Sequence, residues 1–311
     1  MNERPPLRHA LYHYTCEYDA WGVMESFAVP DRKPEPGIVK NFLDVRVPPK
    51  ILPRALNGLA GQLEPLPDPG NWHADIAEWA AALLSVVRAS GTYRIVELGC
   101  GWGCWMVNMG AAARARGLAV DLIGIEGDRG HLANAREVLE LNGFGDSQFS
   151  LHHGIAGPKP GKAIFPDPET GTAQWGGEAI FYPDDRTLRQ AEEDRTVQVL
   201  DCKTLSELSN NQVIDLLHID IQGAEADFVV GNMDKIETYV RRVLIGTHSR
   251  AIEGRLCDHF IDHGWIMEME RPAIAPLKAG RPVIRIDGVQ MWSNPALTGA
   301  KAADNAHKGE A

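Results

Sequence analysis

The sequence predicts an α/β fold with a doubly wound, Rossmann-like sheet of seven mostly parallel strands and an N-terminal extension. Short apolar strands alternate with amphipathic helices from residue 93 to residue 263, a rhythm typical of a parallel sheet covered on both faces. The first strand ends in alternating glycines and the second ends in an acid. The last two strands are joined by a loop too short for a helical crossover, which predicts an antiparallel pair.

Composition and charge narrow the class of protein. The chain has 311 residues and a formal net charge of -11, so we expect no groove that follows nucleic-acid phosphates. No apolar run approaches the roughly 20 residues of a transmembrane segment, and the N-terminus lacks an apolar signal core. The five cysteines are scattered, without a paired zinc motif. We therefore expect a cytoplasmic protein that does not bind nucleic acid.

The domain boundaries follow from the same patterns. Residues 1–70 form an N-terminal arm, in which residues 37–49 alternate apolar and polar side chains as a half-buried strand does. Residues 71–296 form the main domain, which opens with a helix capped by Asn71 and closed by Gly91. Residues 297–311 are small and polar, which predicts a disordered tail. An exposed edge strand and the arm together would permit a homodimer.

The main domain alternates strands and helices. Strands are predicted at 93–99, 119–128 and 147–157, separated by helices at 105–117 and 129–143. The parallel rhythm resumes with a strand at 197–202, a helix at 203–209, a strand at 213–220, a helix from 224, a strand at 241–249 and a helix at 252–263. The antiparallel pair at 264–270 and 283–292 completes the sheet.

Residues 157–195 interrupt this rhythm. The segment is rich in Pro and Gly and carries Trp175, Phe181 and Tyr182. A long irregular insertion inside a compact domain is usually a functional loop or a disordered one. Because the aromatic side chains favour a loop that folds over a ligand, we predict a substrate lid here.

The sharpest motif is the turn after residues 93–98. Gly99, Gly101 and Gly103 alternate there, directly after the acid Glu97. Alternating glycines let the backbone turn tightly and approach a ligand at a helix N-terminus. Glu126 ends the next strand, where an acid accepts hydrogen bonds from ribose hydroxyls. Together these features predict a nucleotide-binding site.

Several blocks resemble the FkbM family of class I methyltransferases that use S-adenosylmethionine (SAM). The blocks are VELGCGWG, IGIEGD, VIDLLHIDIQGAE, VLIGTHS and DGVQMWSNP, and the resemblance extends from about Gly37 to Pro295. The resemblance implies SAM as the methyl donor, O-methylation of a sugar hydroxyl in a glycan, nucleotide sugar or glycosylated natural product, and the strand order 3-2-1-4-5-7-6. His218 and Gln222 depart from the family pattern, since many relatives carry Lys and Glu at those positions.

The resemblance assigns the cofactor contacts. Glu97 and the three glycines would face the donor, and Glu126 its ribose. The adenine should lie at the end of the strand 147–157, where backbone contact from Gly154 and Ile155 is expected. An NAD-dependent oxidoreductase is the alternative, but the spacing G-x-G-x-G differs from the G-x-G-x-x-G of dinucleotide binders. A non-catalytic nucleotide-binding protein is the third hypothesis.

Polar residues at the ends of the strands 213–220 and 241–249 are the catalytic candidates, because ligands of open α/β sheets bind outside the carboxyl ends of the strands. Asp220 ends the first of these strands, and His248 leaves the second at the same edge. A sugar hydroxyl is a weak acid that needs a general base or a divalent ion. We predict His248 as the base, oriented by Asp220. Mg²⁺ held by Asp220, Glu225 and His248 is the alternative, but it is not favoured because a hard ion prefers more oxygen ligands.

Overall fold

The computed structural model describes residues 9–167 and 176–299. Its main sheet has eight strands in the order β1-β13-β16-β12-β11-β4-β5-β6. Five central strands run parallel, and β16 is antiparallel to both of its neighbours. The strands are β4 (Thr92–Leu98), β5 (Ala119–Glu126), β6 (Phe149–His153), β11 (Leu216–Ile219), β12 (Arg242–Thr247), β13 (Ile266–Arg271), β16 (Gly288–Ser293) and β1 (Thr15–Cys16).

The predicted count of seven strands is wrong because the arm supplies an eighth. In the arm, β1 pairs antiparallel with β13, so that Thr15 lies opposite Glu270. An uncovered edge strand presents unpaired backbone N–H and C=O groups. By pairing with β13, the arm satisfies some of these groups within the chain. The sequence also predicts that the last two strands of the domain form an antiparallel pair, and β13 and β16 confirm this prediction.

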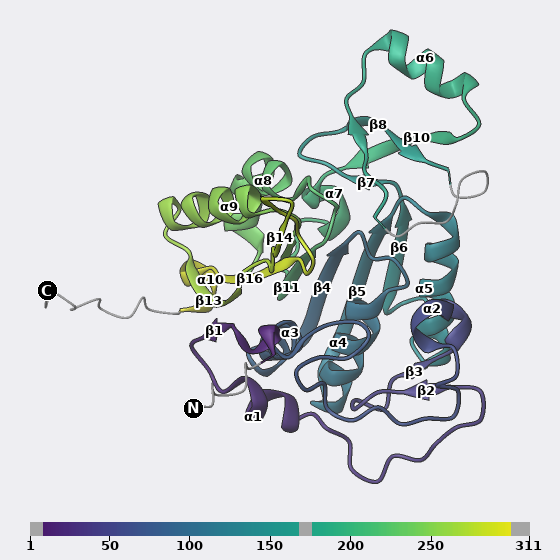
Figure 1. Ribbon diagram of the computed structural model, residues 1–311, viewed down its shortest axis with the longest axis vertical. Coiled ribbons are helices and arrows are strands. Elements are labelled where there is room, and N and C mark those ends of the chain that lie inside the picture. The colour runs from purple at the N-terminus through teal and green to yellow at the C-terminus, as the bar shows by residue number, and fades with distance from the viewer. Residues whose placement is uncertain (1–8, 168–175, 300–311) are drawn as a thin grey trace, which may run out of the picture.

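Helices cover both faces of the sheet (Figure 1). The helices form two groups, and each group contributes side chains to one of two hydrophobic core clusters. The first group is α1 (Ala20–Glu25), α3 (Ile76–Val87), α4 (Cys104–Ala115) and α5 (Arg129–Leu141). The second group is α7 (Leu205–Ser209), α8 (Glu225–Tyr239) and α9 (Arg250–Asp262). Within the described residues, no helix is long and apolar enough to cross a membrane.

The start of α3 differs from the prediction. Asp75, not Asn71, is the N-cap, and its side chain accepts a hydrogen bond from the backbone N–H of Glu78 at 3.0 Å. The Asn71 side chain instead accepts from the N–H groups of His73 and Ala74, each at 3.0 Å. Both residue types make such local bonds readily, so sequence alone does not choose between them. As a result, the loop before α3 has a fixed conformation.

Two predictions about the arm and the tail also need correction. The predicted strand at 37–49 is a pair of short strands, β2 (Val39–Lys40) and β3 (Arg46–Val47), joined by a turn. The tail begins later than predicted, because Asn294 caps a short helix, α10 (Pro295–Thr298). Residues 300–311 of the predicted tail lie outside the described residues.

The interruption after residue 157 contains regular structure. A second sheet, in the order β7-β10-β8-β9, consists of β7 (Ile155–Ala156), β10 (Val197–Lys203), β8 (Gly161–Pro166) and β9 (Ile180–Phe181). It stands above the carboxyl end of β6 and carries α6 (Asp185–Glu193) (Figure 1). The placement of residues 197–202 in the main parallel sheet was wrong, because β10 pairs with β7 and β8. Trp175 lies outside the described residues.

Candidate active site

A cavity of about 810 Å³ opens at the carboxyl ends of β4, β5 and β11. Its walls come from the glycine turn, the end of β5, the loop before α3 and the second sheet. Most of the predicted cofactor-binding residues line it, namely Glu97, Gly99, Gly101, Glu126, Gly154 and Ile155. Its volume lies within the usual range for a small-molecule or cofactor site. The fold therefore brings the predicted nucleotide-binding residues around one space.

The glycine turn has the left-handed backbone that its residues predict. Gly99 has φ of 71°, and a Cβ atom there would collide with the carbonyl oxygen of Asp220. Gly103 has φ of 75° and is the N-cap of α4, but it does not line the cavity. A Cβ atom at Gly103 would approach the Cβ of Ala135 on α5 to 3.2 Å. Gly103 therefore serves close packing of α4 against α5.

Glu97 joins the end of β4 to the start of α4. Its carboxylate accepts hydrogen bonds from the backbone N–H groups of Trp105 at 3.3 Å and Met106 at 2.9 Å. These donors lack partners within the helix, because the first turn of a helix leaves its N–H groups free. Burial raises the pKa of Glu97 to about 8. Glu97 thus fixes the helix N-terminus that faces the cavity.

Glu126 joins the two turns that are predicted to bind the nucleotide. One carboxylate oxygen accepts from the backbone N–H of Gly101 at 2.9 Å, and the other accepts from that of Asp128 at 2.9 Å. A carboxylate oxygen has capacity for a second hydrogen bond. Glu126 can therefore hold the glycine turn and still accept from a ligand hydroxyl.

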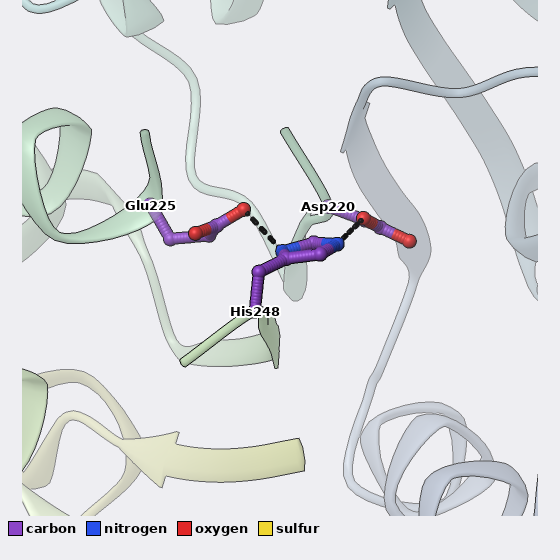
Figure 2. Close-up of side chains that lie close together, drawn as sticks. All are labelled: Asp220, Glu225 and His248. Atoms are coloured by element: carbon purple, nitrogen blue, oxygen red, sulfur yellow. Dashed lines mark hydrogen bonds and ion pairs between the residues drawn. The ribbon is translucent and has the colours of Figure 1, made fainter. Parts of the chain in front are cut away.

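The predicted catalytic residues Asp220 and His248 form a row with Glu225, in which the imidazole lies between the two carboxylates. The His248 ring has Nδ1 2.9 Å from Glu225 Oε1 and Nε2 3.3 Å from Asp220 Oδ1 (Figure 2). Gln222 Nε2 also donates to Asp220 Oδ1 at 3.0 Å. The second oxygen of Asp220 points away from the imidazole (Figure 2). Asp220 lines the cavity, whereas His248 and Glu225 do not.

The charge of the row follows from its burial and its neighbours. Burial lowers the pKa of His248, but the hydrogen bond to Glu225 and the charges of Asp220, Glu225 and Asp287 outweigh it and raise the pKa to about 9. His248 is therefore an imidazolium near neutral pH. Desolvation in the cleft raises the pKa of Asp220, against the opposing effect of His248. The geometry presents a carboxylate to the cavity with a charged histidine behind it.

Three groups in this row are close enough to share a metal ion. One ligand atom each from Asp220, Glu225 and His248 lies within 4.8 Å of the others. The imidazole stands between the two carboxylates, however, so one ion could use only the nitrogen that faces Asp220. Glu225 Oε1 already accepts from the backbone N–H groups of Ile221 and Gly223. The donor set therefore fits a hydrogen-bonded row better than three ligands of one hard ion.

His218 is a second imidazole at the cavity. It is 3% exposed, lines the cavity, and neither ring nitrogen has a hydrogen-bond partner among the described residues. Its Nε2 lies 3.8 Å from Glu78 Oε1, and its ring centroid lies 5.4 Å from that of Trp105. Burial lowers its pKa to about 4, so the ring is neutral near neutral pH. The alternation of side chains in β11 places His218 on the same side as Asp220.

An aromatic wall lies next to His218. It consists of Trp102 and Trp105, together with Trp72 and His73 from the loop before α3. Ring centroids of Trp72 and Trp102 are 5.7 Å apart, and those of His73 and Trp105 are 5.3 Å apart. The sequence feature that could have predicted the position of Trp72 and His73 is Asn71, whose side chain accepts hydrogen bonds from the backbone of this loop.

The cavity is strongly acidic. Six carboxyl side chains line it and, among the residues described, no Lys or Arg does. The acids are Glu126, Asp128, Asp167, Glu178, Asp220 and Glu97, the last of which is largely uncharged near neutral pH because burial raises its pKa to about 8. A low-dielectric space lined by acids attracts a cationic ligand and repels an anionic one.

Comparisons with known proteins agree with this architecture. Residues 91–269 match the model of the methyltransferase FkbM domain. A protein of Jannaschia sp. (strain CCS1), described as "Putative methyltransferase", is 51% identical over 274 residues, which cover 88% of this chain and 98% of that protein.

Two solved structures are also similar. The methyltransferase FkbM from Methylobacillus flagellatus KT is 13% identical, with a TM-score of 0.43, and the match covers 66% of this chain but only 44% of that chain. A precorrin-6y C5,15-methyltransferase from Geobacter metallireducens GS-15 is 9% identical, with a TM-score of 0.36, covering 68% of this chain and 86% of that chain.

With its cavity at the carboxyl ends of a mostly parallel sheet and these sequence matches, the protein is a methyltransferase. The chain belongs to the FkbM methyltransferase domain family, since the family model matches residues 91–269 and the Jannaschia protein is 51% identical over nearly its whole length. The predicted family is confirmed, and a methyltransferase is favoured over the oxidoreductase alternative.

Proposed function

We propose that the protein is a SAM-dependent O-methyltransferase that acts on a sugar hydroxyl. The observation that carries this proposal is the position of Asp220, which lines the same cavity as the glycine turn and Glu126. A donor site and a proton acceptor thus share one space.

The described residues fit SAM. Gly99 and Gly101 allow close backbone approach, and Glu126 offers lone pairs to ribose hydroxyls. The acidic walls suit a ligand with a sulfonium and an ammonium group. Gly154 and Ile155 provide the wall next to Gly127 and Asp128, where the adenine would lie.

The chemistry needs a base because a sugar hydroxyl is a weak acid. Bound SAM supplies an activated methyl group on a positively charged sulfur. The acceptor oxygen forms the new C–O bond while the S–CH₃ bond breaks, and the bonding electrons stay on sulfur. The acceptor proton passes to the oxygen of Asp220 that His248 does not occupy. These roles are the reverse of those predicted from the sequence, since Asp220 acts as the base and His248 as its positioning residue.

One wall of the cavity suits a sugar. Trp72 is partly exposed there and offers a flat apolar face, with Trp102 packed against it, while Gln222 offers polar contacts. Such a combination of aromatic surface with a few placed polar groups is usual in small-molecule sites. The acidic lining favours an acceptor whose reacting ring carries no negative charge.

Two measurements test the proposal. Calorimetry should show binding of SAM and S-adenosylhomocysteine, with NAD⁺ much weaker. Radiolabelled SAM should then transfer its methyl group to the hydroxyl of at least one compound in a panel of methyl glycosides, nucleotide sugars and glycosylated macrolides. Absence of SAM binding would end the donor assignment. Transfer confined to amines or carboxylates in a matched panel would end the hydroxyl assignment.

A further inference from the structure

A second concavity, of about 460 Å³, lies at the same edge of the sheet. It is formed by the loop between β13 and β16, together with His13 of the arm and Arg250 of α9. Register places it near the catalytic row, because Gly288, which follows the loop, pairs with Thr247, which precedes His248. Arg250 follows His248 by two positions. The concavity therefore adjoins the candidate active site.

The loop carries an unusual charge for this protein. Residues 271–286 contain Arg271, Lys278, Arg281 and Arg285 and no acid, although the whole chain has a formal net charge of -11. The acids Glu270 and Asp287 flank the segment, and the charge of Asp287 acts on His248. Positive charge is thus concentrated beside a cavity lined by acids.

Most of this charge is not neutralised within the chain. Arg271 pairs with Asp75, but Lys278, Arg281 and Arg285 make no ion pair among the described residues. Other arginines in the same part of the fold are paired, as Arg255 is with Asp227. Unpaired guanidinium groups retain all their donors for an external oxyanion.

Two arginines and a histidine face the concavity, which no described acid lines. Arg250 Nη2 donates to the carbonyl of Ala273 at 3.3 Å, which orients its guanidinium at the rim. The loop itself is braced, because Ile274 and Ile286 are joined by backbone hydrogen bonds. Pro272, Ile274 and Pro276 supply an apolar floor. The arrangement offers charge at the rim and a surface for a carbon ring below it.

We propose that this concavity is a subsite for an oxyanion, a phosphate or a carboxylate, carried by the acceptor. The donor cavity and this subsite have opposite charge, so a negatively charged group of the acceptor is drawn out of the donor cavity while an uncharged hydroxyl stays beside Asp220. The assignment to the acceptor rests on the proposed function. Binding of the oxyanion itself does not.

The test uses small probes at low ionic strength, where exposed charges are least screened. Calorimetry measures binding of inorganic phosphate and of D-glucuronate, with methyl β-D-glucopyranoside as the uncharged counterpart. We expect saturable millimolar binding of at least one anion. Arg250→Gln and Arg285→Gln should each weaken it at least fivefold. Arg88→Gln, which removes an exposed charge at the C-cap of α3, is the matched control and should leave it unchanged.

The outcomes separate cleanly. Phosphate binding alone identifies a phosphorylated acceptor, and glucuronate binding alone identifies an acidic sugar. The proposal is overturned if neither anion saturates, if the uncharged glycoside binds equally well, or if the two arginine variants behave like the control. SAM binding is measured on the same samples. Its loss with anion binding intact would remove the proposed function and leave the oxyanion site in place.

Discussion

Gly101 donates its backbone N–H to Glu126 at 2.9 Å, so the glycine turn after β4 is tied to the acid that ends β5. The two halves of the proposed donor site are therefore one hydrogen-bonded unit. A substitution in either half should therefore alter the conformation of the other.

Glu126→Ala should weaken SAM binding by about 2–5 kcal/mol, because it removes charge-assisted hydrogen bonds to the ribose and frees the turn. Gly101→Val should also weaken binding, since its φ of 51° disfavours a β-branched residue. Calorimetry on folded variants measures the loss. Glu140→Ala, on the exposed face of α5, is the control. Unchanged SAM affinity in both site variants would contradict the assignment.

Asp220→Asn should lower kcat by about 10²–10⁴ with little change in SAM affinity, because the amide keeps the shape but accepts no proton. His248→Ala should lower kcat in the same range, by releasing Asp220 from its 3.3 Å contact. The two variants differ in their pH profiles, since only the second retains a carboxylate base. Full activity of Asp220→Asn would return the role of base to an imidazole.

The charge of His248 gives stability a predictable dependence on pH. Its pKa is about 9 in the folded state and 6.5 in the reference state. A raised folded pKa stabilises the protein fully below pH 6.5, and this contribution is lost as pH rises through 9. A shift of this size corresponds to at most about 3 kcal/mol.

Chemical unfolding between pH 6 and pH 10 measures this effect. The wild type should lose stability over that interval, and His248→Gln should lose much less. His263→Gln, which removes a more exposed histidine paired with Glu237, provides the comparison. An equal slope in wild type and His248→Gln would show that His248 is not charged.

EDTA should leave methyl transfer unchanged. Both ring nitrogens of His248 already have partners, Glu225 at 2.9 Å and Asp220 at 3.3 Å, so neither nitrogen is available to a metal ion. Activity that EDTA abolishes and Mg²⁺ restores would make Asp220 a metal ligand. Assay of Glu225→Gln under both conditions would then show whether Glu225 orients the ring of a ligating histidine.

The second sheet should act as a lid over the cavity. Phe165 and Phe181 from β8 and β9 line the cavity, and α6 is attached to the same sheet. Hydrogen exchange in residues 157–195 should slow when S-adenosylhomocysteine and an acceptor bind together. Exchange in α8 should not respond. Equal protection of the segment in every state would contradict the lid.

The residues proposed to bind the donor are easier to group from the sequence than those proposed to bind the acceptor. Gly99, Gly101 and Glu126 lie within short turns whose geometry is local, so spacing alone predicts that they lie together. Trp72, His73 and His218 come from different elements, and only tertiary packing brings them together. The roles of Asp220 and His248 could not be ordered from sequence, because their charges depend on burial.

The same dependence on tertiary packing explains the errors in the predicted fold. The strand at β1 is two residues long, too short to show a period. The strand at β10 has the apolar content of a central strand, and only its pairing with β8 places it in another sheet. Local patterns specify that a strand exists, whereas its neighbours are set by distant parts of the chain.

The pairing of Thr15 with Glu270 also bears on synthesis of the protein. The partner of β1 emerges from the ribosome only after all five parallel strands have been translated. The N-terminal arm must therefore wait while the central strands assemble, and the loop that it closes contains all of them. Contacts so distant in sequence form slowly, because the entropy of closing the loop is lost before the contact forms. Docking of the arm is thus a late step of folding, and a ribosome-bound chain that ends before β13 would carry an undocked N-terminus.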